Sequence, residues 1–317
     1  MTTGYPGNFH NFKTSPTQFY TWNNYRCAYE VHTPIDVENN QKIALLLIHP
    51  IGVGLSRHFW QRFYEKWYHL GRENLIYNPD LLGCGESSMP RLAYTPNDWA
   101  EQLQDFLLIL RRPVILVVQG ALFPVAIALI RKLSISHLIK GIILSGPPAW
   151  PVITKKAEHW QQKLTWNLLN SPLGNGFYRY ARGEKFLRSF STRQLFAEEE
   201  QVDTEWLNML KLGSRNMASR YAVFAFLARF WQQGYEQAIT KINQPTLVVL
   251  GEKISSISKS GTKETPIQRS QAYIKHLPKG ETVFISGRNV LPYESTAEFV
   301  KVVADFVDKI ESNILKT

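Results

Sequence analysis

Short apolar runs recur along the chain and end at proline, glycine, asparagine or aspartate. They are rich in isoleucine, valine and leucine, which is typical of strands buried on both faces. They predict strands over residues 43–48, 74–78, 113–118, 141–144, 246–250 and 282–285. Between them, apolar residues at helical spacing predict helices over residues 97–110, 122–133 and 297–310.

Strands that alternate with helices imply right-handed crossovers and helices on both faces of the sheet. We therefore expect an α/β fold with a doubly wound, mostly parallel sheet. Nearer the start, residues 18–22 and 26–32 flank Asn23-Asn24, a dipeptide that favours a hairpin turn. This hairpin is expected to form an antiparallel edge of the sheet.

The alternation stops between residues 150 and 241, where helical patterns continue without a convincing strand. We interpret residues 150–241 as an inserted helical lid, and its many aromatic side chains mainly as the core of that lid. Residues 1–32 then form an N-terminal segment with the edge hairpin. Residues 33–149 and 242–317 form the α/β core.

Composition narrows the class of protein. Hydrophobic residues make up 44% of the chain and charged residues 20%, and no apolar run reaches the roughly 18 residues of a membrane-spanning helix. The first residues do not resemble a secretory signal. These features predict an intracellular protein, either cytoplasmic or peripheral to a membrane surface, and not a secreted one.

Charge and cysteine content exclude further classes. The formal net charge of +10 favours contact with anionic membranes or acidic partners, but no arginine-rich run supports nucleic-acid binding. Cys27 and Cys84 are too few for a disulfide framework and lack the spacing of metal ligands. We expect two reduced thiols, no metal site and no cofactor.

Two motifs follow the first core strands. Residues 45–48 run into His49-Pro50-Ile51-Gly52-Val53-Gly54 and then Phe59-Trp60. Residues 78–87 read Asn-Pro-Asp-Leu-Leu-Gly-Cys-Gly-Glu-Ser. In this order they resemble the oxyanion loop and the Asp-x-x-Gly-x-Gly-x-Ser loop of the α/β-hydrolase fold superfamily. The resemblance covers residues 40–312 and is strongest to the esterase, haloalkane dehalogenase and haloperoxidase branch, and to triad-less members from cyanobacteria and chloroplasts.

The resemblance implies a nucleophile elbow, Gly-x-Ser-x-Gly, after the strand at residues 113–118. This chain reads Val118-Gln119-Gly120-Ala121-Leu122 there, so Gly120 occupies the position of the nucleophile. Glycine preserves a turn at positive φ but supplies no attacking atom. We therefore interpret Gly120 as a tight-turn glycine.

The other two triad positions are also replaced. The family's Gly-x-x-Asp is Gly251-Glu252-Lys253-Ile254 here, which places Ile254 at the acid position. Glu252 is a candidate substitute, although a solvated surface role is favoured. The family's Gly-His-x-Pro-x-x-Glu is similar to residues 287–294, with Val290 at the histidine. Removing triad members from a serine hydrolase lowers its rate by roughly 10⁴- to 10⁶-fold.

Other chemistry has few candidates at the expected pocket mouth: His49, Ser56, His58, Asp80, Cys84 and Ser145. None forms a recognisable pair, and His49 is expected to be a structural turn residue. Cys84 has no adjacent histidine to lower its pKa and is expected to be inert.

The sequence therefore predicts a pseudo-hydrolase that binds an apolar small molecule or a protein partner as a scaffold. Its pocket candidates are His49, Pro50, Ile51, Gln119, Gly120, Ala121, Ile254 and Val290. Two alternatives stay open. One is a hydrolase or lyase with a relocated catalytic constellation, and the other is a peripheral membrane or complex-assembly protein, indicated by the positive charge and the basic, aromatic lid.

Overall fold

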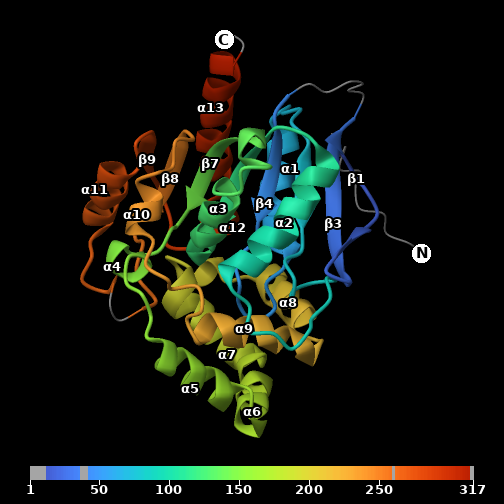
Figure 1. Ribbon diagram of the computed structural model, residues 1–317, viewed down its shortest axis with the longest axis vertical. Helices are drawn as coiled ribbons and strands as arrows, with labels where there is room; N and C mark the ends of the chain where they lie inside the picture. The colour runs from blue at the N-terminus through green and yellow to red at the C-terminus, as the bar shows by residue number, and fades with distance from the viewer. Residues whose placement is uncertain (1–11, 36–41, 259–260, 315–317) are drawn as a thin grey trace.

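A single sheet organises the computed structural model, which describes residues 12–35, 42–258 and 261–314 (Figure 1). Within these ranges it has nine strands in the order β1-β3-β5-β4-β6-β7-β8-β9, and β2 pairs with β3. Their bounds are β1 Phe12–Thr14, β2 Gln18–Trp22, β3 Tyr25–Pro34, β4 Ala44–Ile48, β5 Ile76–Pro79, β6 Val114–Gln119, β7 Ile139–Ser145, β8 Thr246–Gly251 and β9 Gly280–Ile285. Every pairing from β5 to β9 is parallel, which confirms the predicted mostly parallel sheet.

The predicted hairpin is present at the antiparallel edge, where β2 pairs with β3 and β3 pairs with β1 and β5. Asn23 and Asn24 both have positive φ, 46° and 63°. Two central residues at positive φ define the hairpin turn whose twist matches the flanking strands. The predicted N-terminal segment also included residues 1–11, which lie outside the described residues.

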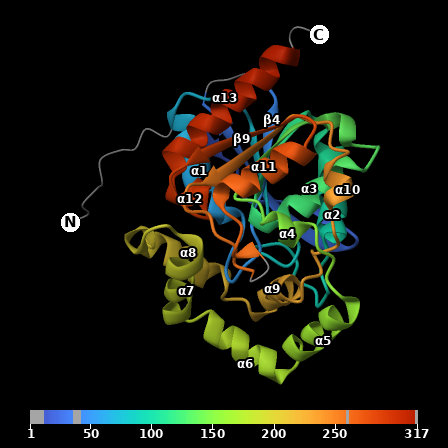
Figure 2. The same ribbon diagram turned by 90° about the vertical axis from the view of Figure 1, so that its left-hand side faces the viewer.

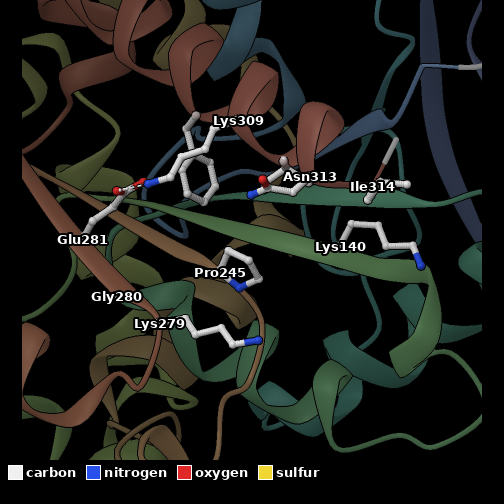
Figure 3. A pocket seen from close by; sticks show the side chains of 10 residues that line it. Lys140, Pro245, Lys279, Gly280, Glu281, Lys309, Asn313 and Ile314 are labelled. Carbon is white, nitrogen blue, oxygen red and sulfur yellow. Dashed lines mark hydrogen bonds and ion pairs between the residues drawn. The ribbon is translucent and has the colours of Figure 1, made fainter. Parts of the chain in front are cut away.

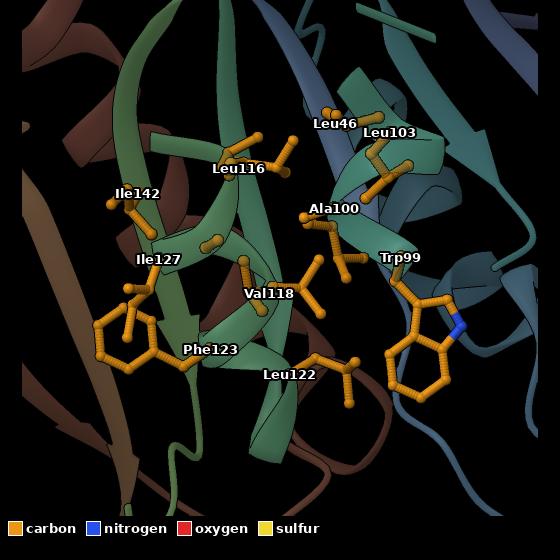
Figure 4. Packing of buried hydrophobic residues seen from close by; sticks show 14 of the residues in the cluster. Leu46, Trp99, Ala100, Leu103, Leu116, Val118, Leu122, Phe123, Ile127 and Ile142 are labelled. Carbon is orange, nitrogen blue, oxygen red and sulfur yellow. The ribbon is translucent and has the colours of Figure 1, made fainter. Parts of the chain in front are cut away.

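Successive side chains of the central strands point to opposite faces of the sheet, and each face packs into its own hydrophobic core. Leu46 and Val118 belong to the cluster on one face of the sheet, with α2 (Pro96–Leu110), α3 (Phe123–Ile130) and part of α11 (Pro266–His276) (Figure 4). Leu47 and Val117 belong to the cluster on the other face, with α1 (Gln61–His69), α12 (Leu291–Glu294) and α13 (Thr296–Ile314). Both faces are buried, so the strands read as continuous apolar runs.

All three predicted helices begin at different residues from those expected, and the one predicted over residues 297–310 is α13, which begins one residue earlier. The helix expected at residue 97 starts at Pro96, because Thr95 caps it and exchanges hydrogen bonds with Asp98 in a capping box. The helix expected over residues 122–133 is a short 3-10 turn, Gly120–Leu122, followed by α3, which ends at Ile130.

Residues 150–241, called the lid segment below, join β7 to β8 and carry α4 to α10 (Figure 2). Their bounds are α4 Trp150–Ile153, α5 His159–Leu169, α6 Pro172–Ala181, α7 Glu184–Phe190, α8 Thr204–Gly213, α9 Arg220–Leu227 and α10 Glu236–Ile239. A π-helical turn, Ser191–Leu195, follows α7. Several lid aromatics are core residues, including Tyr178, Trp206 and Phe224, whereas Trp160 and Tyr180 are exposed.

None of the helices in the described parts of the chain combines the length and the apolar character that a membrane span requires.

Candidate functional site

The turn after β6 has the geometry of a strand-to-helix elbow. Gly120 follows the last residue of the strand, Gln119, and has a φ of +59°. A Cβ atom placed on Gly120 would meet no neighbouring heavy atom within 4 Å. Gly120 and Ala121 are half-buried. The turn is therefore kept in a conformation that disfavours L side chains, beside space that no side chain fills.

Hydrogen bonds bring the loops after β6, β7, β8 and β9 together at the carboxyl edge of the sheet. The Gln119 Nε2 atom donates to the Asn289 carbonyl at 2.6 Å, and the Lys253 N–H donates to the Gly287 carbonyl at 3.0 Å. The Gly146 N–H donates to the Val249 carbonyl at 2.9 Å. The segments that carry Gly120, Ile254 and Val290 thus meet at one edge, as the topology of a parallel sheet implies.

Ile254 and Val290 are packed as core residues. Ile254 is 5% exposed and belongs to the same cluster as Val118 and Leu122. Val290 is 3% exposed and belongs to the cluster that contains Phe59 and Trp206. Neither side chain can accept or orient a proton. Whether the two share a pocket with Gly120 stays a prediction.

Of the other predicted pocket residues, His49, Ile51 and Gln119 are buried and Pro50 is half-buried.

A cavity lies at the opposite edge of the sheet (Figure 3). It is a groove of about 420 Å³ between the amino ends of β7 to β9 and the last turns of α13. Its lining includes Lys140, Lys279 and Lys309, and Lys309 forms an ion pair with Glu281 at 2.6 Å. The sequence did not predict this groove.

His49 is engaged at both ring nitrogens. Its Nδ1 atom lies 2.9 Å from the Pro50 carbonyl, and its Nε2 atom accepts a hydrogen bond from the Leu81 N–H at 3.0 Å. These contacts fit a neutral ring with the proton on Nδ1, and burial lowers the pKa of His49. His49 therefore joins the two motif loops, in agreement with the structural role predicted for it.

Asp80 is committed to a buried ionic network. Its carboxylate accepts the Arg57 N–H and the Glu86 N–H, both at 2.8 Å, and forms an ion pair with the Arg57 guanidinium. Arg57 also contacts Glu30 at 2.8 Å and Glu86 at 2.6 Å. Arg57 and Asp80 are 1% and 0% exposed, so the network is a structural clamp between the two motif loops.

The remaining candidates do not form a nucleophile and base. Burial raises the pKa of the Cys84 thiol, which favours the unreactive protonated form. Ser56 accepts a long 3.4 Å hydrogen bond from the His58 N–H and caps a short helical turn. Glu252 is exposed, as expected for a solvated residue. Among the described residues, no three His, Cys, Asp or Glu side chains are grouped so that they could hold a metal ion.

Two buried polar atoms beside the elbow have no hydrogen-bond partner among the described residues: the Oε1 atom of Gln119 and the Oγ atom of Ser145. These residues are register partners on the neighbouring strands β6 and β7, so their side chains leave the same face of the sheet. Buried polar groups are nearly always paired, with protein, water or ligand. This pair marks a polar spot next to Gly120.

Glu294 is a residue whose role the sequence did not reveal. Its carboxylate accepts hydrogen bonds from the Ala197 N–H at 2.9 Å, the Arg288 N–H at 2.6 Å and the Val290 N–H at 3.3 Å. Burial raises its pKa. Glu294 thus joins the lid segment to the loop after β9. The only signal in the sequence was a motif glutamate displaced by one position.

Comparisons with known proteins agree with this fold. The model of the alpha/beta hydrolase family matches residues 45–302. A search of curated proteins gave no match.

Several solved structures share the fold. They include a thermophilic esterase from Thermogutta terrifontis, with 18% identity, a TM-score of 0.69 and coverage of 93% of this chain and 99% of that one. A bromoperoxidase from Bacillus anthracis has 16% identity, a TM-score of 0.67 and coverage of 92% and 100%. An enol-lactonase from Burkholderia xenovorans LB400 has 14% identity, a TM-score of 0.68 and coverage of 92% and 100%. At these identities the similarity concerns the fold.

Proposed function

Because the chain belongs to the alpha/beta hydrolase family, we propose that it is a non-catalytic member, a pseudo-hydrolase that keeps the site of the fold without its triad. The observation that carries this proposal is Gly120. Its φ of +59° retains the elbow, and the space around its missing side chain remains open. A hydrolase of this fold places its attacking oxygen at this turn, and glycine has none.

The partners of a nucleophile are missing as well. Ile254 and Val290 occupy the positions where the family has its acid and histidine, and both are buried apolar side chains. His49 is the nearest histidine by motif, and both of its nitrogens are engaged. A general base must reach the proton that it removes, so His49 does not meet this requirement without breaking its contact with Leu81 or Pro50.

We further propose that the site holds a small, mostly apolar molecule with one polar group. The apolar replacements at the triad positions suit the body of such a molecule. The unpartnered Gln119 Oε1 and Ser145 Oγ atoms offer an acceptor and a hydroxyl to its polar end. Scaffolding of a protein partner, with the site left empty, is the competing function.

Native mass spectrometry of protein purified from its own source tests the proposal. A retained molecule in stoichiometric amount, lost in a Gly120→Leu variant whose side chain enters the open space beside the elbow, is the expected result. Gly176→Leu, in a lid helix where a Cβ would also meet nothing within 4 Å, is the matched control and should keep the molecule. An empty protein with a co-purifying partner would favour the scaffold instead.

A further inference from the structure

Two lid helices each expose a stripe of large apolar side chains. On α5 the stripe consists of Trp160, Leu164 and Leu168, which are 63%, 63% and 55% exposed. On α6 it consists of Leu173, Phe177 and Tyr180, which are 72%, 37% and 68% exposed. Spacings of three and four residues place each set on one side of its helix. Scattered exposed apolar residues are ordinary, but two adjoining stripes indicate an interaction surface.

The opposite sides of the same helices are anchored to the lid segment. The Gln162 Nε2 atom of α5 donates to the Arg229 carbonyl at 2.9 Å, and the Tyr178 hydroxyl of α6 lies 2.7 Å from the Ser219 Oγ atom. Gln162 is 8% exposed and Tyr178 is fully buried. The two helices lie at the end of the molecule farthest from the end of α13, in both views (Figures 1 and 2). Their stripes therefore lie on the more exposed sides of the two helices, although the Tyr180 ring also meets the Phe186 ring edge to face, with centroids 5.3 Å apart.

The segment that carries the stripes is strongly basic. Glu158 and Glu184 are the two acidic residues in residues 155–193. The same range holds eight basic residues: Lys155, Lys156, Lys163, Arg179, Arg182, Lys185, Arg188 and Arg193. This segment thus supplies a net charge of +6 of the +10 of the whole chain. Lys163 and Arg179 are exposed beside the apolar residues Leu164 and Tyr180.

We propose that the surface formed by α5 and α6 docks onto an anionic lipid bilayer. An amphipathic helix with aromatic and leucine residues on one side and lysine or arginine beside them lies in the plane of the headgroup region. Anionic headgroups attract the basic side chains, and the stripes enter the boundary of the acyl chains. A second copy of the chain fits this surface less well, because it would bring two segments of charge +6 together.

This docking surface goes beyond the function proposed for the elbow and does not depend on it. A protein with an empty elbow would still dock, and a protein that lost docking would still retain a molecule beside Gly120. Vesicle sedimentation can therefore refute the docking surface, and native mass spectrometry the bound molecule, each without affecting the other proposal.

Sedimentation with vesicles tests the docking surface. The full chain is mixed with phosphatidylcholine vesicles that contain either no anionic lipid or about 30% phosphatidylglycerol, a level that gives the surface a negative potential. We expect binding to the anionic vesicles, and a loss of about tenfold or more in Leu164→Ser/Leu168→Ser/Leu173→Ser, since each serine removes apolar area from the interface. Lys163→Glu/Arg179→Glu should bind more weakly and with a smaller dependence on salt.

Matched controls keep the test specific. Leu133→Ser and Ile267→Ser change residues that are 89% and 64% exposed but lie outside the lid segment, and they should bind as the wild type does. Thermal melting should show that all variants remain folded, because the substituted side chains are exposed. Equal binding of the triple-serine variant, equal binding to uncharged vesicles, or self-association in place of vesicle binding would each overturn the proposal.

Trp160 provides a second readout. It is 63% exposed, so a brominated acyl chain should quench its fluorescence when the protein docks. Trp160→Phe keeps an apolar ring, and should keep binding while losing most of that quenching. Undiminished quenching in this variant would place another part of the molecule in the bilayer and overturn the assignment.

Discussion

The side chain of Gln119 and the backbone of Asn289 are joined by a 2.6 Å hydrogen bond that spans 170 residues of sequence. It ties the end of β6 to the loop that carries Val290. Asn289 in turn bonds to the lid segment, through its own N–H to the Leu195 carbonyl at 3.0 Å and through Nδ2 to the Gln194 carbonyl at 2.7 Å. Gln119 and Asn289 thus link the elbow, the loop after β9 and the lid segment through hydrogen bonds.

Gln119→Ala should lower the free energy of unfolding by about 1–3 kcal/mol, since it leaves the Asn289 carbonyl without its buried donor. Urea unfolding measures the change. The control is Gln104→Ala, which removes a 3.0 Å hydrogen bond to Ser134 near the surface and should cost less than about 0.5 kcal/mol. Equal costs for the two variants would show that the Gln119 bond does not fasten the loops.

Alanine variants of Gly120 and Gly176 show whether a side chain at the elbow is disfavoured by backbone conformation or by lack of space. A Cβ would meet nothing within 4 Å at either position, but only Gly120 has a positive φ. Gly120→Ala should destabilise the protein by about 1–2 kcal/mol because of the left-handed conformation. Gly176→Ala, within α6, should stabilise it by about 0.5–1 kcal/mol through helix propensity. If both variants had a higher melting temperature than the wild type, the backbone at Gly120 would not be strained.

Arg57→Met should be the most destabilising of these changes. It leaves the buried carboxylate of Asp80 without its ionic partner, and breaking a buried pair in this way costs about 3–5 kcal/mol. Lys211→Met is the control, because it removes an ion pair with Glu184 whose side chains are 42% and 52% exposed. Such a surface pair contributes far less to stability than a buried one. A small cost at Arg57 in chemical unfolding would mean that the network does not clamp the two motif loops.

His32 should make the protein less stable in mild acid. Burial, and then the positive charge of Arg57, lower its pKa from 6.5 to about 3, so the ring is neutral in the folded protein at pH 7. Its 4.0 Å approach to Glu30 is therefore not an ion pair at that pH. Below about pH 6.5 the unfolded chain takes up a proton that the folded chain excludes. The stability contributed by neutral His32 is complete above that pH and is lost as the pH falls toward about 3.

The His32→Phe variant measures this contribution. Between pH 6 and pH 4, a single such histidine raises the unfolding constant by about tenfold per pH unit, so the variant should have a slope smaller by about one proton. His159→Phe changes an exposed ring and serves as the control. The same slope in His32→Phe and the wild type would assign the acid sensitivity to other groups, such as His49.

Much of the fold was predictable because its signals are local. The Asn23-Asn24 turn and the apolar runs of β4, β6 and β8 predicted their elements within a few residues. Helix boundaries set by capping residues were predicted less accurately. Thr95 caps the start of α2 through a side-chain hydrogen bond, which the spacing of apolar residues does not indicate.

The candidate site was predictable only where a motif marked it. Gly120 was found through its place after β6, and its positive φ agrees with a turn glycine. The role of Glu294, the Gln119–Asn289 bond and the unpartnered Ser145 hydroxyl depend on contacts between distant segments. The sequence also could not predict that the stripes on α5 and α6 are exposed, because the same pattern of aromatic residues fits the core of a lid.

Covalent labelling shows whether the elbow of the proposed pseudo-hydrolase is free of catalysis. The purified wild type is treated with a fluorophosphonate and a short-chain nitrophenyl ester, and its intact mass and rate of hydrolysis are measured. We predict no added mass and no turnover above that of Gly120→Ala, because the proposed pseudo-hydrolase has no activated nucleophile. A stoichiometric adduct mapped to Ser145, Ser56 or Cys84, together with turnover that His49→Ala abolishes, would contradict the claim and identify a relocated catalytic site.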